Sequence, residues 1–175
     1  MLNISRLLDK SECIALLCYK ATTHWSLIKF CFQIPLVLTS SAMCIINSIS
    51  QDANDIKIYN IVVNAISVLI ISVNNSVKAS EKYELFKKLS QSFIILSQEI
   101  ESLNNECTPE QYKIICLKYD NLILDVNFED CPFYIKKNVS LSFSNNNRHI
   151  PIQLNGVIGQ HMKIRITSAE IGSSV

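Results

Sequence analysis

The chain has 175 residues, of which 49% are hydrophobic and only 18% charged, and its formal net charge is +1. This length suits one domain or one membrane module with a small appendage, and the composition is too apolar for an ordinary small enzyme. The near-neutral charge provides no basic field for nucleic acid. Glycine is absent before Gly156, which excludes a glycine-rich phosphate loop from most of the chain.

Residues 1–29 predict an amphipathic helix, because apolar residues recur at helical spacing between charged ones. The same charges interrupt any signal-peptide core, so no cleaved signal is expected. The helix should run past His24 and Trp25 into the apolar stretch that follows. A Trp at that point suits a membrane–water interface, where the ring is apolar and its N–H stays wet. His24 is either a titrating switch or an ordinary interfacial polar residue.

Two uncharged stretches, Phe30 to Gln51 and Ile58 to Val77, dominate the chain. As helices they would each be about 30 Å long, which matches the hydrocarbon thickness of a bilayer. A bilayer leaves no water for backbone groups, so such stretches cross it as helices. We therefore expect a transmembrane hairpin. Two buried helices of a soluble bundle remain the alternative, since Asn64, Asn74 and several serines dilute the second stretch.

Pro35 lies one turn inside the first stretch, where it should remove a backbone hydrogen bond and kink the helix. Thr39, Ser40 and Ser41 follow, and their hydroxyls can satisfy freed carbonyl groups or allow close helix packing. The kink either shapes a gate or serves ordinary packing.

The second stretch carries a polar stripe of Asn60, Asn64, Ser67 and Asn74, whose spacings of 4, 3 and 7 predict one helical face. Polar groups in hydrocarbon are costly unless they are paired or hydrated. The stripe is therefore interpreted as a contact between helices or, alternatively, as the lining of a pore.

Charge asymmetry around the two stretches predicts their orientation. The intervening turn is net negative, whereas lysines precede the first stretch and follow the second. The positive-inside rule then places both termini on the cytosolic side of the membrane.

Beyond Lys78 the helix is expected to continue as a heptad seam. Its apolar residues step by three and four: Phe86, Leu89, Phe93, Leu96, Ile100 and Leu103. This seam would pack against the N-terminal helix or join subunits.

Two short helices should follow. Thr108, Pro109 and Gln111 form a capping box that predicts a helix to about Asp125, and Pro132 predicts the start of another. Residues 157–175 are expected to be a strand or a tail that orders only on a partner.

No catalytic constellation is found. The three histidines have no metal-ligand spacing, and the seven cysteines form no Cys-x-x-Cys pair, which indicates small hydrophobic residues rather than disulfides or zinc ligands. We expect no enzyme activity, cofactor, metal ion, small-molecule substrate or nucleic acid.

The order of several short motifs resembles the SLATT group of two-span membrane proteins over about residues 15–156. The first half of the resemblance lies in Tyr19-Lys20-Ala21, His24-Trp25, Ile34-Pro35, Thr39-Ser40-Ser41, an Asn-bearing second span and a long helix through Phe86. The second half is similar to versions in large eukaryotic DNA viruses, in Lys118-Tyr119-Asp120-Asn121-Leu122, Pro132-Phe133-Tyr134-Ile135, Ile150-Pro151 and Leu154-Asn155-Gly156. The chain has Ala42-Met43 where the family usually has glycine, so tight helix packing there is not carried over.

The resemblance implies a membrane effector that forms pores, as regarded in bacteria, or a membrane or virion component, as in viruses. Taken together, we expect an all-α protein with a two-span hairpin and its cytosolic extensions at 1–105, a small helical subdomain at 106–156 and the tail. Its expected role is a non-enzymatic anchor in a host membrane or a virion inner membrane. The lipid bilayer is one partner, and self-association or a protein shell such as a capsid is the other. The alternatives are a pore-forming oligomer and a soluble helical bundle.

Overall fold

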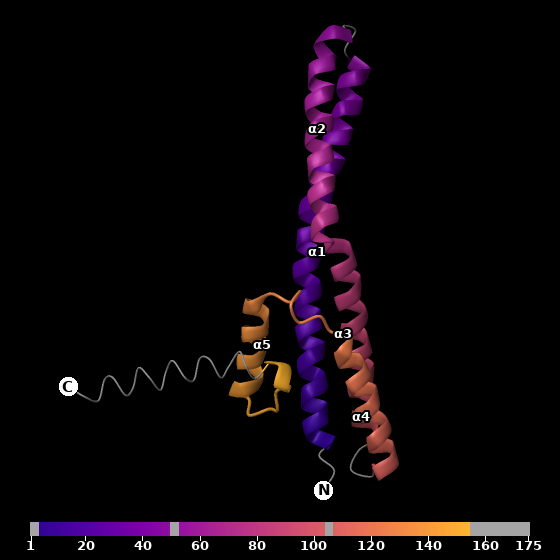
Figure 1. Cartoon of the computed structure of the whole chain (residues 1–175), viewed down its shortest axis with the longest axis vertical. Helices are drawn as coiled ribbons and strands as arrows, with labels where there is room; N and C mark the ends of the chain where they lie inside the picture. The colour runs from indigo at the N-terminus through magenta and orange to yellow at the C-terminus, as the bar shows by residue number, and fades with distance from the viewer. Residues whose placement is uncertain (1–3, 50–52, 104–106, 155–175) are drawn as a thin grey trace, which may run out of the picture. The chain divides into compact units, whose positions relative to one another are not determined.

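A computed structural model describes residues 4–49, 53–103 and 107–154, and regular structure in these ranges is entirely helical. The helices are α1 (Ile4–Ile49), α2 (Ala53–Val77), α3 (Ala79–Ser102), α4 (Pro109–Leu124) and α5 (Phe133–Asn145) (Figure 1). The all-α prediction is thus confirmed for the described ranges. The predicted tail at 157–175 lies outside them.

The chain divides into two compact units. Unit 1 comprises Met1–Ala21 and Leu85–Val175, and unit 2 comprises Thr22–Glu84. This division differs from the boundaries at 105/106 and 156/157 drawn from sequence. Helices α4 and α5 belong to the same unit as the start of α1, and each has buried apolar residues. The ring of Tyr119 on α4, for example, meets that of Phe93 on α3 edge-on at 6.0 Å.

Helix α1 is a single helix of 46 residues that contributes to both units. At about 1.5 Å per residue it is roughly 69 Å long, more than twice the hydrocarbon thickness of a bilayer. Its charged residues all lie between Arg6 and Lys29. Pro35 is inside the helix and does not end it.

The core of unit 1 is centred on the heptad seam of α3. Five of its six residues are buried, namely Phe86, Leu89, Phe93, Leu96 and Ile100, and only Leu103 is half-exposed. The start of α1 contributes the fully buried Ile14, Leu17, Cys18 and Ala21. The seam is therefore filled by side chains of the same chain.

Serine hydroxyls fasten α1 to α3 beside this seam. Ser11 Oγ donates to the carbonyl of Phe93 at 3.2 Å, and Ser90 Oγ donates to that of Ala15 at 3.3 Å. Ser97 Oγ lies 2.9 Å from Ser11 Oγ and 2.9 Å from the carbonyl oxygen of Phe93. Small side chains allow two helix backbones to approach closely enough for these bonds, which also satisfy the buried hydroxyls.

Helix α4 begins at the predicted capping box. The Thr108 hydroxyl accepts from the Gln111 N–H at 3.3 Å, and the Gln111 side chain accepts from the Thr108 N–H at 2.9 Å. Pro109 occupies the first turn, where its missing N–H costs nothing.

Helix α5 follows Pro132, which is its N-cap residue. Ile135, Val139 and Phe143 are buried on one face, with Pro151 and Leu154 also buried farther along the chain.

Lys78 interrupts the helix that the sequence predicted to continue from α2 into α3. Its φ of 53° is left-handed, and α3 begins at the next residue, Ala79, which is fully buried. The Lys78 N–H still donates to the Asn74 carbonyl at 3.0 Å, and the Lys82 N–H donates to the Lys78 carbonyl at 3.1 Å. A left-handed non-glycine residue costs about 1–2 kcal/mol. Helix does continue past Lys78 as predicted, but as the separate helix α3, because a helical pattern on both sides does not reveal a single left-handed residue between them.

Leu96→Ala should lower the free energy of unfolding of the full chain by about 2–5 kcal/mol, because it opens a cavity in the packed seam. The neighbouring Ile95 is 64% exposed, so Ile95→Ala is the matched control and should change little. Chemical unfolding in detergent micelles, followed by circular dichroism, measures both variants. A loss below about 0.5 kcal/mol for Leu96→Ala would contradict a packed seam.

Candidate membrane-contacting surface

Unit 2 consists mainly of the later part of α1 and all of α2, which run antiparallel beside each other (Figure 1). The half-buried residues of α2 recur at steps of three and four: Asn60, Val63, Ser67, Ile70, Asn74 and Val77. On α1 the half-buried set includes Phe32, Leu36, Thr39 and Met43. Each helix therefore turns one heptad-spaced stripe toward the other.

Three of the four polar-stripe residues lie on this contact stripe of α2. Asn60, Ser67 and Asn74 are half-buried, and Asn60 Nδ2 lies 3.4 Å from Asn47 Oδ1 on α1. Asn64 is exposed instead. The four residues were predicted to share one helical face. Helix α1 covers this face at Asn60, Ser67 and Asn74 and leaves Asn64 at the edge of the contact.

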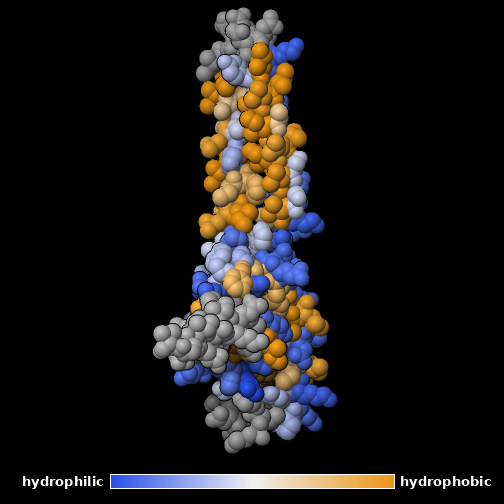
Figure 2. Space-filling model, turned by 60° about the vertical axis from the view of Figure 1, so that its left-hand side comes forward, coloured by the Kyte–Doolittle hydropathy of each residue, from blue (hydrophilic) through white to orange (hydrophobic). Residues whose placement is uncertain are grey.

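Much of the remaining surface of unit 2 is apolar. Large hydrophobic side chains that are at least 38% exposed occur on both helices, and they include Leu27, Phe30, Ile34, Val37, Leu38, Ile45, Ile46, Ile58, Ile61, Val62, Ile66, Val68, Leu69, Ile71 and Val73. Figure 2 shows hydrophobic residues covering this part of the chain on the face in view. Two helices can bury only one stripe each, so these side chains have no cover within the unit.

Two helical stretches, Ile4–Ser48 and Lys57–Ser102, are long and apolar enough to cross a membrane by length and composition. No residue in the most apolar window of either stretch is buried within the chain. A core helix of a soluble protein that passes the same test would be mostly enclosed by its own fold.

The hydroxyl groups of the apolar region are mostly satisfied by their own helix. Thr39 Oγ1 donates to the carbonyl groups of Pro35 and Leu36 at 2.9 and 3.0 Å, and Ser41 Oγ donates to Val37 at 2.8 Å. The carbonyl that Pro35 leaves without an N–H is that of Cys31, so Thr39 acts one turn later than expected. Ser40 is exposed. A kink at Pro35 stays a prediction.

A cluster of cations and aromatic rings marks the charged end of unit 2. Lys82 Nζ lies 4.5 Å from the ring centre of Trp25, and Lys29 Nζ lies 4.9 Å from that of Tyr83. Each pair is a cation–π contact between α1 and α3. Trp25 is only 8% exposed, so its ring packs inside the protein rather than lying open at an interface. His24 is half-buried and meets Trp25 edge-on at 5.4 Å.

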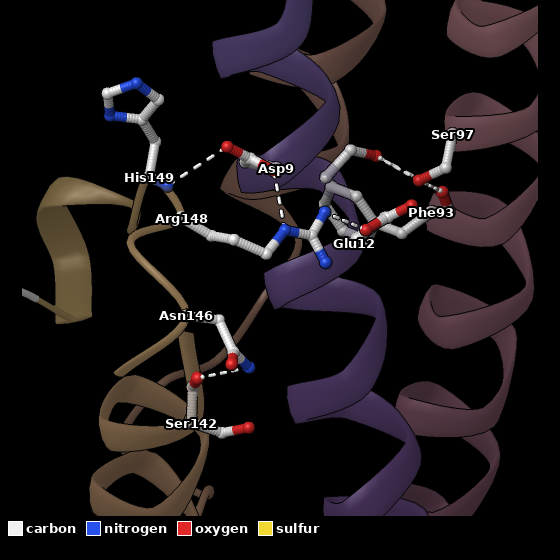
Figure 3. Close-up of polar contacts among 9 residues, drawn as sticks. Asp9, Glu12, Phe93, Ser97, Ser142, Asn146, Arg148 and His149 are labelled. Atoms are coloured by element: carbon white, nitrogen blue, oxygen red, sulfur yellow. Dashed lines mark hydrogen bonds and ion pairs between the residues drawn. The ribbon is translucent and has the colours of Figure 1, made fainter. Parts of the chain in front are cut away.

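An ionic clasp joins the two ends of unit 1, and sequence reasoning missed it. Arg148 Nε donates to Asp9 Oδ1 at 2.7 Å, and its Nη2 pairs with Glu12 (Figure 3). The His149 backbone N–H donates to Asp9 Oδ2 at 3.1 Å. Burial alone lowers the pKa of Arg148, but the bonds to Glu12 and Asp9 outweigh it and raise the pKa. The clasp joins α1 to the segment after α5, across more than 130 residues of sequence.

Hollows on unit 1 differ in their lining. One of about 340 Å³ lies between α1 and α3 and is mainly apolar, with Ala15, Leu16 and Ile94 among its walls. Another of about 510 Å³ is polar and has Lys10 and Arg148 among its walls.

The buried thiols of unit 1 are neutral and weakly nucleophilic. Burial raises the pKa of Cys13 and of Cys18 to about 12, and that of Cys131 to about 11. A neutral thiol is a poor nucleophile, so these cysteines act as small hydrophobic residues. Among the residues at 4–49, 53–103 and 107–154, no group of three or more His, Cys, Asp or Glu side chains is placed to hold a metal ion.

Comparison with known proteins gives no relative: no family model, no curated protein and no solved structure matches this chain.

Arg148→Ala should loosen α5, because it leaves Asp9 and Glu12 without their cation. Loss of a charged hydrogen-bond partner costs about 1–3 kcal/mol, so amide exchange of residues 133–145 should accelerate by about 5- to 150-fold. Hydrogen exchange with mass spectrometry on the full chain in micelles measures this.

The control for the clasp is Lys88→Ala, which removes an exposed cation from α3. Equal exchange of α5 in the two variants would show that Arg148 does not hold this segment. Arg148→Lys should show an intermediate rate, because an ammonium group cannot reach both carboxylates as the guanidinium does.

Proposed function

We propose that this chain is a non-enzymatic integral membrane protein that crosses the bilayer twice and anchors unit 1 on the cytosolic side. The observation that carries the proposal is the uncovered apolar surface of unit 2. Exposed apolar patches of more than a few hundred Å² are rare on soluble monomers and mark contacts with a protein or a membrane. A bilayer covers such a surface all round the helix pair.

The two spans in this proposal are the uncharged stretches Phe30 to Gln51, which α1 describes up to Ile49, and Ile58 to Val77 on α2. Each is about 20 residues long, enough for a helix to cross the hydrocarbon core of a bilayer. Lys29 and Lys82, which lie over the rings of Tyr83 and Trp25, suit the anionic headgroup level of the cytosolic leaflet. The positive flanks support a topology with both termini in the cytosol.

Unit 1 is the part that such an anchor would display. Its helices are joined by buried packing, serine bonds and the Arg148 clasp, and this fold suits a docking module rather than an active site. The SLATT-like resemblance, in its viral form, supports a role in a host or virion membrane. The capsid shell is the protein partner that suits an anchor in that setting.

A pore-forming oligomer is the second candidate, and a soluble helical bundle is the third. The polar stripe motivates the pore, but three of its residues turn toward α1 within unit 2, which supports their role in joining the helices. The soluble bundle would need another protein to cover the apolar surface of unit 2 completely.

Topology tests the proposal first. In a chain with Cys107→Ser and Cys116→Ser, a membrane-impermeant maleimide applied from outside should label Asn54→Cys, because Asn54 lies between the two spans. The same reagent should label Asn146→Cys only after the membrane is permeabilised. The unmodified background, whose remaining cysteines lie buried in unit 1 or in the spans, controls for native thiols. Equal labelling of both sites in sealed membranes would refute the hairpin.

Conductance separates the anchor from the pore. Full-length protein reconstituted in planar bilayers should carry no current, since the proposed role needs no water path along α2. Insertion is verified by co-flotation of the protein with lipid vesicles. A steady current that Asn60→Leu abolishes in an inserted protein would instead establish the pore, by drying a hydrated constriction.

A further inference from the structure

Helix α2 carries a second heptad-spaced stripe that α1 does not cover. Ile61, Asn64, Val68, Ile71 and Asn75 step by 3, 4, 3 and 4 along the helix, and all five are exposed. This spacing is the pattern of a helix–helix seam. Three of the five are β-branched residues, whose stiff side chains lose little freedom on packing.

Contact of the Asn64 side chain with lipid is unfavourable in free energy. The residue lies six positions after Ile58, or about 9 Å into the proposed span, and its amide has no hydrogen-bond partner among the described residues. Nearby hydroxyls differ, since Ser72 donates to the Val68 carbonyl of its own helix at 2.8 Å. A polar group inside hydrocarbon costs free energy unless it is paired.

The side chains of the stripe indicate that its partner is a second copy of α2. An amide is both donor and acceptor, so two copies of Asn64 related by a two-fold axis can pair with each other. Copies inserted in one orientation bring α2 beside α2 in parallel, which places Asn64 opposite Asn64. Water is a poor occupant, because Ile61, Val68 and Ile71 make the rest of the stripe apolar.

We propose that the outward stripe of α2, centred on Asn64, is a self-association surface that joins two copies of this chain within the membrane. The inference rests on the proposed membrane insertion and adds the partner of the spans. It also gives Asn64 a role distinct from that of Asn60, Ser67 and Asn74, which join the two helices of one copy.

Energy transfer between donor- and acceptor-labelled full-length copies in lipid vesicles, measured over a range of protein-to-lipid ratios, tests the proposal. Asn64→Leu should weaken association by about 3- to 30-fold, which is the usual effect of losing an interhelical hydrogen bond in a membrane. Asn64→Gln keeps an amide and should retain most of the association. Ser41→Leu on α1 is the matched control, since the Ser41 hydroxyl is exposed and already bonded to its own helix.

Co-flotation with vesicles in the same samples tests membrane insertion separately from self-association. If wild-type protein floats and shows no energy transfer, or if Asn64→Leu associates as strongly as Ser41→Leu, the self-association surface is refuted and membrane insertion stands. If the protein does not float, both are refuted.

Discussion

The uncovered apolar surface of unit 2 is the constraint on which the rest of the account depends. A pair of helices buries one stripe on each, and a helix that is apolar on its other faces needs a further apolar surrounding. Leu38 on α1 and Leu69 on α2 are both more than 60% exposed, although each is a large apolar side chain. The bilayer meets this requirement with the fewest assumptions, since it needs no particular partner to form a stable contact.

In unit 1, by contrast, the helices cover each other's apolar faces. The seam around Phe93 fills the centre, and Ser11 and Ser97 satisfy their own hydroxyls there. Charge is kept at the edge, where Arg148 joins two carboxylates of α1 that lie one turn apart. The first turns of α1 thus carry carboxylates and hydroxyls that bond to other segments, whereas its later part is uncharged and most of its hydroxyls bond to their own helix.

Sequence patterns predicted the features that depend on neighbours within one helix. The seam from Phe86 to Ile100 and the capping box of Thr108 and Gln111 follow from spacings of three and four residues. The clasp of Arg148 could not be predicted, because its partners are 136 and 139 residues away and a lone arginine has no spacing signal. The serine contacts could have been predicted in part, since Ser90 and Ser97 each follow a seam leucine and lie seven residues apart, which places both on the same side of α3. The different burial of Asn60 and Asn64 could not be predicted from sequence. The two residues are one helical turn apart, and only the position of α1 decides that Asn60 is covered and Asn64 is exposed.

Extraction of membranes from cells that express the chain tests the central claim most directly. Alkaline carbonate removes proteins held by surface contacts, whereas proteins whose helices cross the hydrocarbon stay with the lipid until detergent dissolves it. A chain that crosses the bilayer twice should remain in the membrane pellet after carbonate and be released by detergent. Complete release of folded protein by carbonate alone would contradict it, and the apolar surface of unit 2 would then have to be covered by protein.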